Sequence, residues 1–388
     1  MGKKSILIIA FTALHKDPRV IRQVDALQSI YNIETIGFTQ VKEDIKNHKI
    51  TPQLNSIFKK VIRKVLSFAH LHTILNYFLL NDRLKELNQL GNDYSLIICN
   101  DLYPLPLGVS LAEKFKVPLW SDLHEYYPSQ VNPSFVSNWE YKYHILWLCK
   151  KYITKATFIS TVCDCIAKEY KLRFNIEITG IIDNATFYNR ENKPSLVSKK
   201  VRIVHHGVAA SIRKMEEMVY MMKYLGDDYE LIFYLIASSK ANKAYLNKLK
   251  EIVFKENLNI KFEAPVSTNN LSKELNKYDI GLFILPPLTL NYKCALPNKL
   301  FEFIQARLAI AVSPNTEMKR IVESYNLGVV SDDYTAISMA KEINSLTKET
   351  IEKHKEESHK WAMELSAEKN ISLIQSISKK MISSQKVN

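Results

Sequence analysis

Short apolar segments alternate with longer amphipathic ones along most of the 388 residues, and this alternation limits the possible folds more than any other feature. In the first half, the apolar segments are Ser5 to Phe11, Glu34 to Phe38, Leu96 to Asn100, Pro118 to Asp122 and Thr157 to Val162. Apolar runs of this length are typical of strands that are covered on both faces. Amphipathic stretches lie between them, such as Arg19 to Ser29, which Asp17 and Pro18 open as N-cap and first helical residue. Alternating strands and helices predict a parallel sheet with right-handed crossovers.

The alternation stops in the polar segment 189–200 and then starts again. The second set of strand candidates is Val201 to His205, Leu231 to Ala237, Ile260 to Phe262, Asp279 to Leu285, Ala309 to Val312 and Gly328 to Val330. A chain of this length suits two hydrophobic cores better than one. We therefore predict an α/β protein with a Rossmann-like domain over 1–188, a linker over 189–200, a second such domain over 201–365, and a helical tail over 366–388.

The net charge of +13 is compatible with three kinds of partner: nucleic acid, an anionic membrane surface or a phosphorylated substrate. The basic residues are spread along the chain, and the sequence contains no zinc-finger, helix-turn-helix or aromatic RNA-binding signature. We therefore expect no nucleic acid. The sequence has no apolar run of about 18 residues, and no cleavage site follows Ser5 to Phe11. These features predict a cytoplasmic protein.

The segment Leu296 to Ile304, Leu-Pro-Asn-Lys-Leu-Phe-Glu-Phe-Ile, followed by Ala309 to Val312, resembles the donor-site helix of family 4 GT-B glycosyltransferases, the glycosyl transferases group 1. Further landmarks follow the family's order: His15 to Val20, Asp122 to Glu125, Ser160 to Val162 and Ile182 to Ala185. The resemblance implies the GT-B fold, in which two Rossmann-like domains face each other across a cleft. It also implies that C-terminal helices pack back toward the N-domain. The implied activity is glycosyl transfer from a nucleoside diphosphate sugar to a glycan or lipid-linked acceptor, in bacterial capsule, lipopolysaccharide or exopolysaccharide assembly.

Several residues of the second domain are expected to hold the donor. A carboxylate at Glu302, about one turn into its helix, can accept hydrogen bonds from both ribose hydroxyls. Asn298 and Lys299 lie one turn earlier, near the positive end of the helix, where a diphosphate is attracted. Gly207 lies in a segment that resembles the glycine-containing turn under the donor phosphates in this family. Arg213 and Lys214 open the next helix in this interpretation, and the resemblance implies that one of them neutralises the diphosphate leaving group.

One departure from the family concerns the second glutamate that usually lies eight positions before Glu302. Cys294 occupies this position, and the stretch Thr289 to Ala295 contains no acid. The transferred sugar and the stereochemical outcome therefore stay open. Two alternatives to a transferase also stay open: a nucleotide-sugar 2-epimerase on the same scaffold, and a catalytically degenerate binding or assembly subunit.

Catalytic candidates follow a strand of the first domain. His124 and Glu125 lie just beyond the carboxyl end of the strand that ends at Asp122, which is where α/β proteins place their sites. His124 can act as a base or orient the sugar, and Glu125 or Asp122 can deprotonate an acceptor hydroxyl.

No Asp-X-Asp triplet occurs in the sequence, so we expect an enzyme that uses Lys and Arg in place of a divalent cation. The Gly-X-Gly-X-X-Gly and Walker patterns are missing as well, which argues against NAD and ATP. The sequence therefore predicts no metal and no cofactor apart from the nucleotide-sugar substrate.

The segment Ile57 to Ala69 is amphipathic, with its apolar residues on one half of a helical wheel and Lys59, Lys60, Arg63 and Lys64 on the other. It can lie on an anionic membrane, which would make the protein peripheral on the inner face of the plasma membrane. It can equally be a helix packed on the N-domain sheet with its charges outward. The aromatic residues Trp139, Tyr143 and Trp147, near Lys142, Lys150 and Lys151, either extend this surface or belong to the core.

Overall fold

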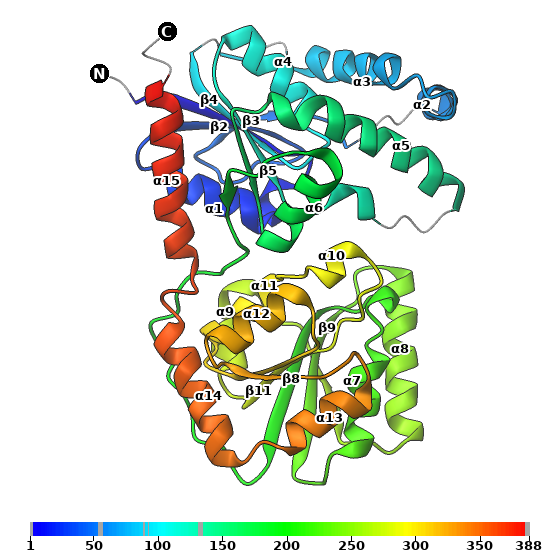
Figure 1. Cartoon of the computed structure of the whole chain (residues 1–388), viewed down its shortest axis with the longest axis vertical. Helices are drawn as coiled ribbons and strands as arrows, with labels where there is room; N and C mark the ends of the chain where they lie inside the picture. The colour runs from blue at the N-terminus through cyan, green and yellow to red at the C-terminus, as the bar shows by residue number, and fades with distance from the viewer. Residues whose placement is uncertain (1–2, 53–56, 88–89, 92, 131–134, 385–388) are drawn as a thin grey trace. The chain divides into compact units, whose positions relative to one another are not determined.

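A computed structural model describes residues 3–52, 57–87, 90–91, 93–130 and 135–384, with the backbone alone at 57–60, 63, 135–141 and 269. The chain divides into two compact units, which are described separately. Unit 1 comprises Met1–Asp183 and Asn370–Asn388, and unit 2 comprises Asn184–Lys369. Figure 1 shows the helices and strands of both units.

The described part of unit 1 contains a seven-stranded sheet in the order β3-β2-β1-β4-β5-β6-β7. The strands are β1 (Ser5–Ile9), β2 (Asn32–Gly37), β3 (Lys46–Lys49), β4 (Tyr94–Asn100), β5 (Leu119–Leu123), β6 (Phe158–Thr161) and β7 (Gly180–Ile181). All of their pairings are parallel, and Ile8 of the central β1 lies between Thr35 of β2 and Ile98 of β4. The predicted parallel sheet is therefore confirmed for the first half of the chain.

The helices of unit 1 follow the crossovers of this sheet. They are α1 (Pro18–Leu27), α2 (Ile57–Phe68), α3 (His72–Glu86), α4 (Leu105–Phe115), α5 (Phe135–Tyr152) and α6 (Asp164–Phe174), with the 3-10 turns η1 (Leu14–Lys16), η2 (Tyr127–Ser129) and η3 (Ile153–Lys155). As expected, Asp17 caps α1, because its side chain accepts from the amides of Arg19 and Val20 at 3.1 and 3.3 Å. Because Pro18 has no amide hydrogen to satisfy, it suits the first turn.

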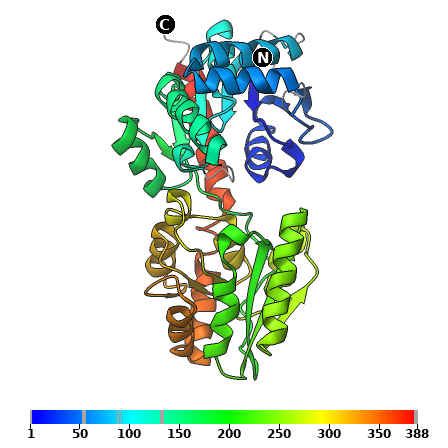
Figure 2. The ribbon, with the colours of Figure 1, turned by 90° about the vertical axis from the view of Figure 1, so that its right-hand side faces the viewer.

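The C-terminal helix α15 (Ala367–Ser384) packs on unit 1 from Asn370 onward (Figures 1 and 2). Ile374, Met381 and Ile382 are buried in the same hydrophobic cluster as Ile6 of β1. The Gln375 amide also donates to the Ala26 carbonyl oxygen at 2.8 Å. The prediction that C-terminal helices pack back toward the N-domain is confirmed by α15, whereas α14 (Lys348–Trp361) stays in unit 2.

Unit 2 contains, in its described part, a six-stranded sheet in the order β10-β9-β8-β11-β12-β13. The strands are β8 (Val201–Val208), β9 (Tyr229–Ile236), β10 (Ile260–Glu263), β11 (Ile280–Phe283), β12 (Ala309–Val312) and β13 (Gly328–Val330), all paired in parallel. The helices besides α14 are α7 (Glu216–Met221), α8 (Lys240–Lys255), α9 (Thr268–Leu275), α10 (Leu290–Lys293), α11 (Asn298–Gln305), α12 (Thr316–Ser324) and α13 (Ala336–Asn344), with η4 (Ser211–Arg213) and η5 (Met222–Tyr224). This unit repeats the architecture of unit 1 without repeating its sequence.

The unit boundaries differ from the predicted domains, because residues 184–200 belong to unit 2 and residues 370–388 to unit 1. The polar segment 189–200 was predicted to be a linker, yet it lies against unit 2. The buried Asn192 donates to the carbonyl oxygens of Ser272 and Gln305, each at 2.9 Å. Hydrogen bonds of Asn192 therefore attach this segment to unit 2, although most of its other residues are exposed.

Within the described residues, no helix has both the length and the apolar composition that crossing a membrane requires.

Candidate functional site

A glycine near the end of β8 brings two cations of unit 2 close to the backbone. Gly207 has a φ of +121°, which side-chain-bearing residues rarely adopt. A Cβ atom on it would lie 2.9 Å from the Lys299 Nζ and 3.6 Å from the Arg213 Nη1. The backbone conformation therefore favours glycine, and a side chain at this position would also displace the Lys299 ammonium group.

Lys299 lies in the first turn of α11 and is only 6% exposed. Its Nζ donates to the His206 carbonyl oxygen, lies 3.2 Å from the His205 Nε2, and lies 4.6 Å from the centroid of the Phe283 ring. Burial, with the neighbouring Arg213 charge, lowers the pKa of Lys299 well below its usual value, and Glu302 offsets this only in part. A buried cation beside a second cation creates a place for an anion.

Two adjacent histidines of β8 support this lysine. The His205 Nδ1 lies 2.8 Å from the Leu282 carbonyl oxygen, so it carries the proton and leaves Nε2 to accept from Lys299. Burial and the Lys299 charge hold the pKa of His205 well below its usual value, so the imidazole is neutral. The pair therefore fixes the position of the Lys299 ammonium group.

Glu302 lies on the next turn of α11, with its side chain mostly buried. The His206 Nε2 lies 3.2 Å from the Glu302 Oε2, although the directions of the groups do not make a well-formed hydrogen bond. Burial, Lys299 and Arg213 all lower the pKa of His206, so this contact involves a neutral imidazole and is no true ion pair. The carboxylate is thus held beside Lys299 at the start of α11.

The two basic residues after β8 have different orientations. Arg213 ends the 3-10 turn η4, and its Nη1 lies 3.5 Å from the Val208 carbonyl oxygen, on the side of Gly207. Lys214 is exposed, with a left-handed φ of 46°. The expectation that both residues open the next helix is wrong, because α7 begins only at Glu216. The backbone reversal at Lys214 separates the two side chains, and only Arg213 faces Gly207.

Two further positions complete this part of unit 2. Asn298 is half-buried at the first residue of α11. Cys294 is fully buried just after the short helix α10, and its amide donates to the Leu290 carbonyl oxygen at 2.8 Å. Asn315 holds this stretch by donating to the Tyr292 carbonyl oxygen at 2.7 Å. The structure thus brings together Gly207, Arg213, Lys299 and Glu302, and leaves Lys214 outside the group.

In unit 1, the candidate residues surround the carboxyl ends of β4 and β5. Asp122 is fully buried and accepts two hydrogen bonds from the Arg19 guanidinium, from Nε and from Nη2, each at 2.8 Å. Gln23 and Ser160 donate to it at 2.9 and 2.6 Å. Burial opposes ionisation, but Arg19 and His124 outweigh it and hold the pKa of Asp122 below its usual range. A carboxylate saturated in this way cannot deprotonate an acceptor, so the structure argues against a catalytic base at Asp122.

His124 lies above this carboxylate, with its side chain 19% exposed. Its Nδ1 is 3.2 Å from the Asp101 Oδ1, and its Nε2 is 3.3 Å from the Asn100 Oδ1 and 3.6 Å from the Asp122 Oδ2. Burial disfavours the charged ring, but Asp101 and then Asp122 raise the pKa of His124 above its usual value. The exposed Glu125 instead accepts from the Gln130 amide at 3.0 Å.

Sequence reasoning missed Asp101 and the role of Arg19. Asp101 has a left-handed φ of 76°, and it directly follows the apolar β4 segment. A polar residue next to the carboxyl end of a predicted strand was therefore the available signal. Arg19 was named only in the predicted helix and in the resemblance, and its distance of 103 residues from Asp122 hid their pairing.

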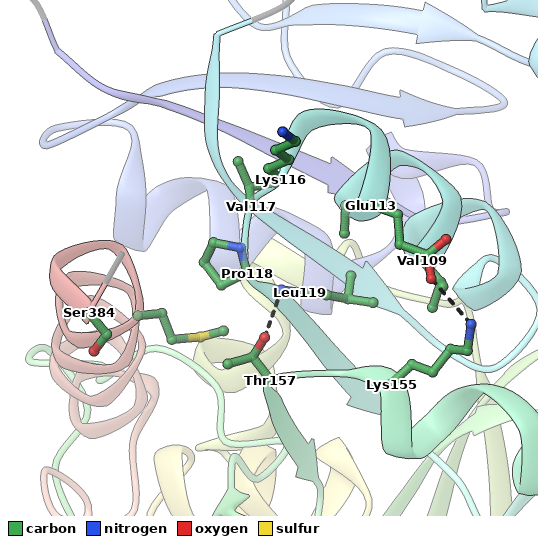
Figure 3. A pocket seen from close by; sticks show the side chains of 11 residues that line it. Val109, Glu113, Lys116, Val117, Pro118, Leu119, Lys155, Thr157 and Ser384 are labelled. Atoms are coloured by element: carbon green, nitrogen blue, oxygen red, sulfur yellow. Dashed lines mark hydrogen bonds and ion pairs between the residues drawn. The ribbon is translucent and has the colours of Figure 1, made fainter. Parts of the chain in front are cut away.

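A separate cavity of about 450 Å³ lies in unit 1 (Figure 3). It is lined by Glu113, Lys116, Leu119, Lys155, Thr157 and Met381, among others. Lys155 and Glu113 pair across it at 3.2 Å. It adjoins Leu119, at the end of β5 opposite to Asp122, so it is distinct from the polar cluster around His124. In the part of the chain that the structure describes, no three His, Cys, Asp or Glu side chains are placed to hold a metal ion.

No protein-family model matches the sequence, and no curated protein matches it. Solved structures do match almost the whole chain. Sucrose-phosphate synthase from Thermosynechococcus elongatus has 12% identity and a TM-score of 0.76, with 98% of this chain and 100% of that chain covered. Anabaena HepE, solved in complex with UDP and glucose, has 12% identity and a TM-score of 0.69, with the same coverage of 98% and 100%. A glycosyltransferase from Rickettsia africae ESF-5 has 12% identity and a TM-score of 0.67, with 98% and 99% covered.

These structural neighbours are glycosyltransferases of the GT-B class, and the two parallel sheets of this chain follow the same architecture. The identities are too low to transfer an activity, but the agreement covers both units. The chain therefore has the GT-B glycosyltransferase fold.

Proposed function

We propose that this protein is a glycosyltransferase that moves a sugar from a nucleoside diphosphate sugar to an acceptor hydroxyl. The observation that carries the proposal is the group formed by Gly207, Arg213, Lys299 and Glu302 in unit 2, where two cations and a carboxylate adjoin a glycine turn. The solved complexes of HepE with UDP and glucose, and of trehalose-6-phosphate from E. coli with UDP-2-fluoro glucose, concern proteins of this fold.

Each member of this group has a role in the proposed donor site. The Glu302 carboxylate accepts hydrogen bonds from the ribose hydroxyls, which are stronger than those between neutral groups. Lys299 and Arg213 bind the diphosphate beside Gly207, where the backbone lets the phosphates approach. Amides of the first turn of α11, including that of Asn298, add positive charge at the same place. When the sugar leaves, the nucleoside diphosphate develops negative charge that these fixed cations stabilise.

The acceptor is proposed to bind unit 1 at His124 and Glu125. Asp101 and Asp122 orient the His124 ring, and their charges favour its protonated form. The exposed Glu125, which accepts from the Gln130 side-chain amide, is proposed to contact an acceptor hydroxyl from the same loop. Asp122 is proposed as a positioning residue that links Arg19 to His124. These roles are compatible with either stereochemical outcome.

The narrower proposal is a metal-independent hexosyltransferase that acts on a glycan or lipid-linked acceptor. Its support is that Lys299 and Arg213 both lie beside Gly207, where these two side chains can bind the diphosphate in place of the metal ion that other enzymes use. The resemblance to family 4 supports a role in capsule, lipopolysaccharide or exopolysaccharide assembly. A lipid-linked acceptor would place the protein in the cytoplasm, at the inner face of the plasma membrane.

The test is a thermal-shift screen of the protein against a panel of nucleoside diphosphate sugars, without metal and with EDTA. A donor at about a hundred times its Kd stabilises the native state by about 2.7 kcal/mol, which corresponds to an increase of about 5–10 °C in Tm for a unit of this size. The selected donor is then incubated with acceptor glycans, and the products are analysed.

Three results would contradict the proposal. The first is that no nucleotide sugar shifts the Tm, and the second is that a shift requires added Mg²⁺ or Mn²⁺. The third is conversion of the donor alone into its epimer, which would identify an epimerase instead of a transferase.

A further inference from the structure

Exposed apolar side chains occur on α2, on the first half of α3 and at Leu71 between them, all in unit 1. The α2–α3 surface comprises Val61, Val65, Phe68, Leu71, Ile74 and Tyr77, which are between 45% and 67% exposed. Val61, Val65 and Phe68 are spaced at i, i+4 and i+7, so they share one face of α2. Ile74 and Tyr77 are three residues apart, so they share one face of α3. Contiguous apolar patches on a protein surface commonly mark interaction sites.

The orientation of α2 differs from that of an ordinary amphipathic helix packed on a sheet. Among the described side chains of α2, the polar Ser67 is buried, whereas the apolar Ile62 and Leu66 are only half-buried. The helix packs against α3 and α5. This packing exposes Val61 and Val65 to solvent. The alternative of a helix that packs on the sheet with only its charged face outward therefore does not hold for these two residues. The side chains of Ile57, Phe58, Lys59, Lys60, Arg63 and Trp139 lie outside the described part.

The aromatic residues of α5 divide between the core and this surface. Trp147 is half-buried and lies within ring-contact distance of His72, His144 and Tyr152, so it packs between α3 and α5. Tyr143 is 40% exposed on the same helix. Tyr143 is thus exposed at the surface, whereas Trp147 packs against its neighbours.

The charged residues of α2 and the first half of α3 are basic, and the acids of α3, Asp82 and Glu86, follow only in its second half. The sequence 51–81 contains Lys59, Lys60, Arg63 and Lys64 and no aspartate or glutamate. Lys64 is exposed next to Val65, and the exposed Lys142 and Lys150 lie on α5. Lysine side chains can keep their charge in water while their stems lie along apolar surface. An apolar stripe with basic residues and tyrosines around it is typical of helices that lie in the interface of an anionic bilayer.

We propose that the α2–α3 surface binds an anionic lipid bilayer, with Val61, Val65 and Phe68 inserted among the headgroups and Lys64 beside the lipid charges. A protein partner would also cover apolar side chains, but the absence of acids over 51–81 favours a surface of uniformly negative charge. The proposal does not rest on the proposed transferase activity, because the surface is described from unit 1 alone.

The experiment is vesicle co-sedimentation of the full chain with phosphatidylcholine alone and with about a third phosphatidylglycerol. The wild type is expected to bind the anionic vesicles and not the neutral ones. Val65→Glu/Phe68→Glu should reduce binding about ten- to a hundredfold, because two half-exposed apolar side chains no longer enter the bilayer. Lys64→Glu should reduce it at least about fivefold.

Matched variants separate this surface from general effects of charge. Leu172→Glu/Phe254→Glu replaces apolar residues that are 79% and 87% exposed elsewhere, and Lys243→Glu reverses an exposed lysine of α8. These variants should bind anionic vesicles like the wild type. Circular dichroism and thermal unfolding must show that every variant is folded, and Val65→Ser/Phe68→Ser replaces any variant that is not.

Three results would overturn the proposal. The first is that the wild type does not bind anionic vesicles. The second is that Val65→Glu/Phe68→Glu binds them as the wild type does. The third is a dimer of the wild type that this double variant dissociates, with no binding to vesicles, which would identify a second copy of the chain as the partner.

Discussion

Replacing Gly207 with alanine tests the geometry of the proposed donor site. At a φ of +121°, alanine introduces backbone strain of about 1–3 kcal/mol. Its Cβ would also lie 2.9 Å from the Lys299 Nζ, so the ammonium group has to move. Losing a charge-assisted hydrogen bond to a phosphate costs about 1.5–3 kcal/mol, or about ten- to a hundredfold in Kd. We therefore expect Gly207→Ala to lower both stability and donor affinity.

Urea unfolding and titration calorimetry with the selected nucleoside diphosphate measure the two effects separately. Gly226→Ala is the matched control, because its Cβ would meet nothing within 4 Å. It should leave donor affinity unchanged. If Gly207→Ala binds the nucleotide as tightly as the wild type, the diphosphate does not depend on the close approach of Lys299 to Gly207, and the reasoning fails.

Two further predictions concern buried charges. Asp122→Asn should destabilise the protein by about 3–5 kcal/mol, since it leaves the Arg19 guanidinium buried without its counter-charge. The pKa of Asp122 in the folded state lies below its unfolded value of about 3.9. The stabilisation that Asp122 provides is therefore present above about pH 5 and is lost as the pH falls. In urea unfolding, the free energy of unfolding of the variant should accordingly decrease less with falling pH than that of the wild type. Diphosphate binding should raise the lowered pKa of Lys299, so donor binding should take up a proton at pH values between the pKa of the free protein and that of the complex. Calorimetry in buffers of different ionisation enthalpy measures this uptake, and Lys299→Met should abolish it; the same uptake in both proteins would assign the proton to another group.

The sequence was sufficient for most of the fold, and the exceptions have physical reasons. Long buried strands such as β1 and β4 are continuous apolar runs, so their periodicity identified them. The edge strands β3, which is polar, and β7, which has two residues, were not predicted. Neither carries the apolar pattern of a strand covered on both faces. The segment 189–200 was predicted to be a linker because hydrogen bonds such as those of Asn192 are not visible in composition.

For the donor site, the residues were predicted but their partners were not. The resemblance indicated Gly207, Lys299 and Glu302, and the structure brings them together. The choice between Arg213 and Lys214 depended on a left-handed backbone at Lys214, which lysine rarely adopts. The support of Lys299 by His205 depends on a contact 94 residues apart in the chain. Such pairings follow from the sheet order, which a single sequence does not specify.

The central claim is that Glu302 holds the ribose of a nucleotide in unit 2. Titration calorimetry of the selected nucleoside diphosphate sugar against the wild type, Glu302→Ala and Glu323→Ala tests it directly. Glu323 is an exposed glutamate on α12 of the same unit, and its substitution should leave affinity unchanged. Glu302→Ala should weaken binding by about 1.5–3 kcal/mol, or about ten- to a hundredfold. An affinity of Glu302→Ala equal to that of the wild type would contradict the assignment.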